Sequence, residues 1–199
     1  MKKEEVNLIY VDDMLDRDIS KCLNKHKHDK VVINYSEINF DSSYDYKKLI
    51  EEMKVQKVNL IVIDSALYIE SDKRERFTGE QFKIILKNIL PYAETIVISQ
   101  NKQENNYGII KKYNRDEVEE DKKEYYEKSL SPVVNKKIEE ILMGREMINL
   151  LEDEKIIDNS LIEKISLSVN GESQYSELKT EDINLLIKSF QELKESIDG

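Results

Sequence analysis

Residues 58–64 read VNLIVID, a short apolar run that ends in a carboxylate. Buried parallel strands have this continuous Val, Ile and Leu composition, because helices cover both faces of their sheet. Three more short runs in the first half of the chain also end in polar side chains: residues 6–11 precede Asp12 and Asp13, residues 95–98 precede Ser99, and residues 108–110 precede Lys111. In open α/β sheets, ligands bind beyond the carboxyl ends of the strands. The polar residues at these positions therefore predict a site there.

Between these runs, apolar residues recur at helical spacing. One stripe follows residue 14, and a second covers residues 46–53, with Ser42 or Ser43 as its N-cap. A third covers residues 82–89 behind Thr78 and Gln81, which have the spacing of a capping box. The apolar residues 31–35 add one more strand. Alternating strands and helices imply a parallel sheet with right-handed crossovers, so we predict a three-layer α/β domain with five strands.

Composition restricts the class of protein. The chain has 199 residues, 39% of them hydrophobic, which suits one domain of ordinary size and a smaller appendage. Its formal net charge of −10 argues against a general nucleic-acid binder, because phosphate contacts need a basic face. No apolar run is long enough for a membrane span or a signal peptide, so we expect a cytoplasmic protein. The lone Cys22 is interpreted as a buried structural thiol.

The order of the polar residues resembles that of the receiver domain of bacterial response regulators, over residues 5–115. That family has a flavodoxin-like fold of five parallel strands. Its members place an acidic pair after the first strand, the phosphoryl-accepting aspartate after the third, a serine or threonine after the fourth and a lysine after the fifth. The matching residues here are Asp12 with Asp13, Asp64, Ser99 and Lys111.

The resemblance implies a function and a metal. Asp64 would accept a phosphoryl group, with Mg²⁺ bound by Asp12, Asp13 and Asp64. Lys111 would pair with the phosphoryl oxygens, and Ser99 would donate a hydrogen bond to one of them. The implied role is two-component signalling, with a phosphodonor kinase as partner. No enzymatic activity is implied beyond the self-phosphorylation and dephosphorylation of a receiver site.

Several positions depart from the family pattern. The loop at residues 65–78 is longer than usual and highly charged, which suits a lid or a docking loop. Gln100 replaces a small residue, and Lys112 stands where proline is usual. Residues 100–110 are too few for a full helix with its loops, so we expect the fourth helix to be short or absent. An alternative therefore stays open, in which a pseudo-receiver scaffold binds its partner without phosphorylation.

The second part of the chain, residues 131–199, is predicted to be a helical extension of a receiver-like domain at residues 1–130. A charge-dense helix at 115–128 precedes it, Ser131 and Pro132 open its first helix, and further helices are expected at 160–167 and 180–197. Residues 132–199 hold eight Lys and Arg against fifteen Asp and Glu, a balance of −7, which is the wrong sign for a DNA-binding module. We expect a protein-interaction element, with a homodimer as one form.

Two other interpretations are weaker. A phosphatase of the haloacid dehalogenase type needs aspartates two residues apart, but Met14 stands two residues after Asp12. His26 and His28 lie in a Lys-rich segment without cysteine partners, so we interpret them as solvated cations at a helix end and not as metal ligands.

Overall fold

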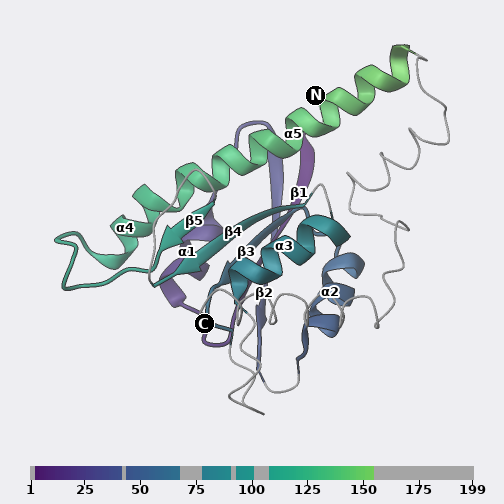
Figure 1. The fold of residues 1–199 in the computed structure, drawn as a ribbon. Coiled ribbons are helices and arrows are strands. Elements are labelled where there is room, and N and C mark those ends of the chain that lie inside the picture. Colours follow the sequence, from purple (N-terminus) through teal and green to yellow (C-terminus); the bar gives the residue numbers. More distant parts are fainter. Residues whose placement is uncertain (1–2, 42–43, 68–77, 91–92, 101–107, 155–199) are drawn as a thin grey trace, which may run out of the picture.

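Five parallel strands form one sheet in the order β2-β1-β3-β4-β5 (Figure 1). The structure is a computed structural model, which describes residues 3–41, 44–67, 78–90, 93–100 and 108–154. The order is that of the flavodoxin-like fold, so the predicted fold class is confirmed. The strands are β1 Glu4–Asp12, β2 Val31–Asn39, β3 Leu60–Asp64, β4 Glu94–Ser99 and β5 Ile109–Lys111.

The register of the strands brings their carboxyl ends to one edge. In β1 and β3, Val11 pairs with Ile63, so that Asp12 and Asp64 end the two neighbouring strands at the same level. Asp64 pairs in turn with Ile98 of β4. The polar residues after the apolar runs therefore gather at this edge, as the sequence predicted.

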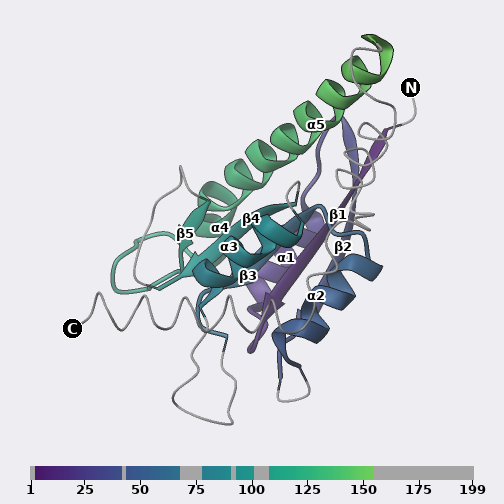
Figure 2. The same cartoon turned by 45° about the vertical axis from the view of Figure 1, so that its right-hand side comes forward.

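Helices cover both faces of the sheet (Figure 2). Helices α2, Tyr46–Val55, and α3, Gly79–Ile89, cover one face. Helices α1, Arg17–Lys25, α4, Lys122–Ser129, and α5, Ser131–Glu154, cover the other. Each face has its own apolar core, and the strands alternate between them because successive side chains point to opposite faces. The domain therefore has three layers.

The helix N-termini are capped by short polar side chains. Thr78 and Gln81 form the predicted capping box of α3, and Asp16 caps α1 by accepting a hydrogen bond from Asp18 N at 3.0 Å. The predicted cap of α2 was wrong: Asp45 and not Ser42 or Ser43 accepts from Lys48 N, at 2.7 Å. Asp45 directly precedes Tyr46, the first buried residue of the helix, and an aspartate at that position satisfies the free amides of the first turn.

Two elements have other bounds than predicted. Strand β2 extends four residues beyond Tyr35, because it pairs with β1 along that strand's whole length. Helix α4 begins at Lys122 and not at residue 115, since Asp121 caps it by accepting from Glu124 N at 2.9 Å. Residues 115–121 form a loop.

Helix α5 belongs to the core of the domain in its first half. Val133, Val134, Ile138 and Ile141 are buried against the sheet, while the last turns of the helix extend past the sheet in both views (Figures 1 and 2). Arg145 Nη1 fixes the helix to the start of β1, at 2.9 Å from both Glu4 Oε2 and Glu5 O.

The two histidines also contact α5. His26 Nε2 is 2.9 Å from Asn135 Oδ1, and His28 Nε2 is 3.2 Å from Glu139 Oε1, with the His28 side chain only 10% exposed. They dock the loop after α1 onto α5, so the prediction of solvated cations was wrong.

Several sequence predictions concern residues that the structure does not describe. These are the reduced fourth helix, of which residues 101–107 lie outside the described ranges, most of the long loop at 65–78, and the helices at 160–167 and 180–197. Within the described ranges, no helix has the length and apolar character needed to cross a membrane.

Candidate functional site

Three aspartates converge at the carboxyl edge of the sheet. Asp12, Asp13 and Asp64 each place one carboxylate oxygen within 4.8 Å of the others. Asp12 and Asp64 are 1% and 5% exposed, and Asp13 is half-buried. These are the three residues that the sequence predicted as metal ligands, and we call them the acidic cluster.

Asp12 is held in place by the strand that carries it. Tyr10 Oη donates a hydrogen bond to Asp12 Oδ2 at 2.5 Å, and Met14 N donates to Asp12 Oδ1 at 3.0 Å. Tyr10 lies two residues before Asp12 on the same face of β1, where a side chain can run alongside it. Tyr10 was not identified from the sequence. Its position two residues before Asp12 in a predicted strand could have indicated that the two side chains lie together.

The hydroxyl of Tyr10 also links the acidic cluster to the helices on its face of the sheet. It accepts a hydrogen bond from Asp16 N at 3.3 Å, and Asp16 Oδ2 lies 2.7 Å from Lys122 Nζ of α4. Contacts therefore run from Asp12 through Tyr10 and Asp16 to α4.

Both oxygens of Asp64 have partners. Lys112 Nζ donates to Oδ1 at 3.1 Å, and Ala66 N donates to Oδ2 at 3.1 Å. Helix α3 approaches the backbone here so closely that a Cβ at Gly79 would lie 2.6 Å from Asp64 O. Beside it, Ser65 Oγ donates to the carboxylate of Glu80, at 2.8 and 2.7 Å from its two oxygens.

The lysine at the acidic cluster is Lys112 and not Lys111. Lys112 Nζ lies 3.1 Å from Asp64 Oδ1 and 3.8 Å from Asp12 Oδ2, whereas Lys111 pairs with Glu117. Strand alternation explains the difference. Ile110 is buried on the α1 and α5 face, and the next side chain on that face is two residues on, at Lys112.

Ser99 ends β4 at the same edge, but its side chain lies on the opposite face of the sheet from Asp12, Asp64 and Lys112. Val97, two residues earlier, is buried on the α2 and α3 face, which places Ser99 on that side. The side chain is 5% exposed, and among the described residues its hydroxyl makes no hydrogen bond with the acidic cluster. The structure thus gathers the three aspartates, and leaves Ser99 and Lys111 out of direct contact with them.

Charge at the acidic cluster is only partly balanced. Burial raises the pKa of Asp12, and burial together with the charge of Asp12 raises the pKa of Asp64, against the lowering effect of Lys112. Burial would lower the pKa of Lys112, but the charges of Asp64 and Asp12 outweigh it and raise that pKa. One ammonium group therefore faces three carboxyl groups.

These residues fit a hard divalent cation. The donors are all carboxylate oxygens, which Mg²⁺ and Ca²⁺ prefer, and the set contains none of the sulfur or imidazole ligands typical of structural zinc sites. A cation would also relieve the excess negative charge of two buried carboxyl groups.

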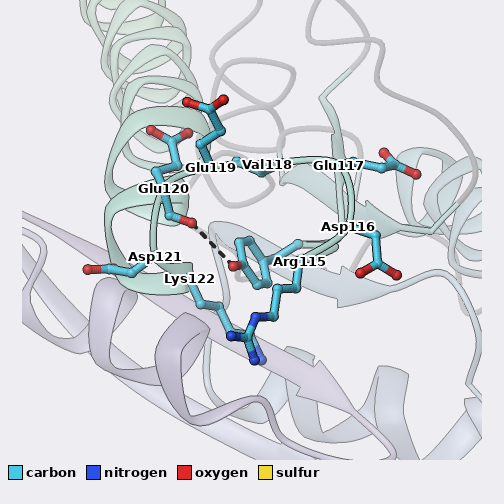
Figure 3. A pocket seen from close by; sticks show the side chains of 9 residues that line it. Arg115, Asp116, Glu117, Val118, Glu119, Glu120, Asp121 and Lys122 are labelled. Atoms are coloured by element: carbon cyan, nitrogen blue, oxygen red, sulfur yellow. Dashed lines mark hydrogen bonds between the residues drawn. The ribbon is translucent and has the colours of Figure 1, made fainter.

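A second feature lies in the loop between β5 and α4, where Tyr113 and residues 115–122 line a hollow of about 820 Å³ (Figure 3). Tyr113 Oη donates across it to Glu120 O at 3.2 Å. Figure 3 shows the carboxyl groups of Glu120, Glu117 and Asp116 pointing in different directions. Because these carboxylates diverge, the hollow does not present a converging set of ligands.

Comparison with known proteins leaves the site to be interpreted from its own geometry. No model of a known protein family matches the chain, and no significant sequence match to a curated protein is found.

Proposed function

We propose that this chain is a receiver-like signalling protein that accepts a phosphoryl group on Asp64 in the presence of Mg²⁺. One observation carries the proposal: at the carboxyl edge of a flavodoxin-like sheet, Asp64 meets a lysine ammonium at 3.1 Å and two further carboxylates within 4.8 Å. Phosphoryl transfer needs positioning and charge neutralisation more than it needs other covalent chemistry, and these residues supply both.

The proposed reaction is a simple displacement. A carboxylate oxygen of Asp64 attacks the phosphorus of a phosphodonor, and the bond from phosphorus to the donor breaks, with its electron pair leaving on the donor. Mg²⁺ held by Asp12, Asp13 and Asp64 would supply charge neutralisation to the phosphoryl oxygens. Lys112 pairs with the acyl phosphate as a compact cation, the role that the sequence assigned to Lys111.

Two further roles belong to this proposal. Ser99 donates a hydrogen bond to a phosphoryl oxygen, which requires a rearrangement at the end of β4 because, among the described residues, its hydroxyl makes no hydrogen bond with the acidic cluster. A kinase donates the phosphoryl group, and the output passes through contacts with another protein in the cytoplasm or through a homodimer formed by residues 131–199. DNA binding is not part of the proposal, since that segment is acidic.

Intact mass spectrometry tests the chemistry. Incubation of the full chain with acetyl phosphate and Mg²⁺ should add the mass of one phosphoryl group, and Asp64→Asn should remove the addition. Asp29→Asn changes an exposed aspartate in the loop after α1 and should leave the addition intact. A wild-type protein that gains no mass, or an equal gain in Asp64→Asn, contradicts the proposal.

One observation favours the pseudo-receiver instead. The ammonium of Lys112 already bridges Asp64 and Asp12, so the fold can neutralise its buried carboxylates without a metal. Under this alternative the scaffold binds its partner constitutively. Thermal unfolding with and without Mg²⁺ distinguishes the two, because only a working metal site gains stability from the ion.

A further inference from the structure

A cavity of about 460 Å³ lies between α1, α4 and the first residue of α5. Four lysines line it, and they come from three segments: Lys21 and Lys25 from α1, Lys27 from the loop after it, and Lys123 from α4. We call it the lysine cavity.

The charge of the lysine cavity is opposite to that of the protein. The chain has a formal net charge of −10, yet the cavity has four lysines against one carboxylate, Glu127. Glu127 lies 3.5 Å from Lys123 in an exposed pair, which neutralises little because water screens it. Lys21 lies 3.8 Å from Asp18 Oδ1 in a second exposed pair, whereas Lys25 and Lys27 form no ion pair among the described residues. A local excess of positive charge is therefore available to a ligand.

A role in helix capping does not account for this arrangement. A lysine in the last turn of a helix interacts favourably with its carbonyl groups, which explains Lys25. Lys123 stands at the opposite, amino-terminal end of α4, where a positive charge is unfavourable. Its contribution to the same cavity is not explained by helix electrostatics.

The remaining lining residues are Cys22, Ser131 and His26, whose imidazole Nε2 lies 2.9 Å from Asn135 Oδ1. Cys22 Sγ lies 3.5 Å from Ser131 Oγ, which joins α1 to the start of α5. None of the described lining residues is Phe, Tyr or Trp, so the cavity has no large aromatic ring for a nucleobase to stack on. Recognition there depends on charge and hydrogen bonding.

We propose that the lysine cavity binds a small polyphosphate-bearing ligand through its phosphate groups. The volume lies within the range of about 300–1,000 Å³ typical of small-molecule sites. Lys25 and Lys27, with Lys21 and Lys123 in weak exposed pairs, match a chain of phosphates better than one phosphate ion, because several anionic groups can then each meet a cation. Nucleoside triphosphates and inorganic tripolyphosphate share this chemistry. The proposal is independent of the acidic cluster.

Cys22 gives a direct measurement, since it is the only cysteine of the chain and lines the lysine cavity. The full-length protein is alkylated with iodoacetamide, a neutral reagent, at constant ionic strength and without divalent metal. Tripolyphosphate should slow the alkylation saturably, and ATP should do so at similar concentrations. Orthophosphate should require far higher concentrations. Calorimetry should give the same dissociation constants.

Charge reversal locates the binding. The double variant Lys25→Glu, Lys27→Glu should weaken tripolyphosphate binding by at least about tenfold, the equivalent of one lost charge-assisted contact. Lys47→Glu, Lys54→Glu changes the same charge on α2, on the other side of the sheet, and should bind as the wild type does. Lys25→Ala, Lys27→Ala, with circular dichroism, checks that the loss does not come from misfolding. Asp64→Asn should retain binding.

Other outcomes overturn the proposal. Protection of Cys22 by ATP but not by tripolyphosphate would show recognition of the nucleoside and not of the phosphates. An equal loss in the α2 variant would show nonspecific attraction, and an absence of both protection and heat of binding would show that the lysine cavity takes no such ligand.

Discussion

Lys112 Nζ lies 3.1 Å from Asp64 Oδ1, and the same ammonium reaches Asp12 Oδ2 at 3.8 Å. One cation therefore bridges the ends of two neighbouring strands, which carry buried carboxylates. In a metal-free protein this contact limits the repulsion at the acidic cluster. Its removal should therefore lower the free energy of unfolding, whether or not the protein is phosphorylated.

Lys112→Met should destabilise the metal-free protein, because it leaves buried carboxylates without their cation. We expect a loss of about 2–3 kcal/mol in the free energy of unfolding, somewhat below the value for a fully buried pair. Denaturant unfolding measures it. The control is Lys111→Met, which breaks an exposed contact with Glu117 and should change stability little. Equal effects of the two variants would contradict the assignment of Lys112.

Mg²⁺ should raise the melting temperature if the acidic cluster binds it in the native state alone. The gain follows RT ln(1 + [Mg²⁺]/Kd), about 2.7 kcal/mol at a hundred times Kd. Asp13→Asn should weaken the dependence on Mg²⁺ by removing one ligand, while Asp29→Asn should leave it unchanged. A melting temperature that is independent of Mg²⁺ in the wild type would instead support the pseudo-receiver.

Gly79→Ala should disturb the end of β3. The new Cβ would lie 2.6 Å from Asp64 O, so either α3 or the strand must shift, at a cost of about 1–3 kcal/mol. The matched control is Gly144→Ala within α5, where nothing lies within 4 Å of the new Cβ. It should stabilise the protein by up to about 1 kcal/mol through helix propensity. Opposite signs of the two changes in denaturant unfolding are the expected result.

Glu94 gives a pH-dependent contribution at the opposite edge of the sheet. Burial alone would raise its pKa, but the hydrogen bond and charge of Lys137, with the charge of Lys87, together lower the pKa below the ordinary value of 4.5. Lys137 Nζ lies 2.7 Å from Glu94 Oε2, with the two side chains 13% and 18% exposed. The stabilisation is present above the unfolded pKa and is lost as pH falls through the lower folded pKa.

Lys137→Met should therefore destabilise the protein by about 2 kcal/mol near neutral pH. The difference from the wild type should shrink below pH 4.5, as Glu94 becomes protonated. Lys87→Met is the control, because Lys87 is 60% exposed and lies 3.4 Å from Glu94 Oε1. It should have a smaller effect. A difference between Lys137→Met and wild type that stays constant through this range would contradict the proposed contact.

The fold could be predicted from sequence because each strand is a short apolar run and each intervening helix has an apolar stripe. Asp12, Asp13 and Asp64 came together because parallel strands bring their ends to one edge. The resemblance pointed to Lys111 because it followed the family spacing, whereas the alternation of the strand brings Lys112 to Asp64. Ile110 marks the α1 and α5 face, and counting two residues on from it reaches Lys112.

Other features depended on contacts between distant segments. The start of α4 is set by the N-cap at Asp121. Many charged residues precede it, so the sequence pattern alone does not single out Asp121 as the cap. The burial of His28 depends on α5 crossing the end of α1, and Glu139 lies over a hundred residues further along the chain. The spacing of residues within one segment does not indicate which distant segment it will contact.

The length of α5 has a mechanical consequence. Its 24 residues make a rod of about 36 Å, and its base adjoins α4, where Lys122 pairs with Asp16. Arg145 holds the rod against the start of β1, so the last turns of the helix lie beyond this anchor. The nine residues beyond Arg145 span about 14 Å, so a tilt of about 5° about this anchor moves the tip by about 1 Å. The stretch from Ser131 to Arg145 is the longer arm, so a displacement at the base of α5 would reach the tip reduced and not amplified.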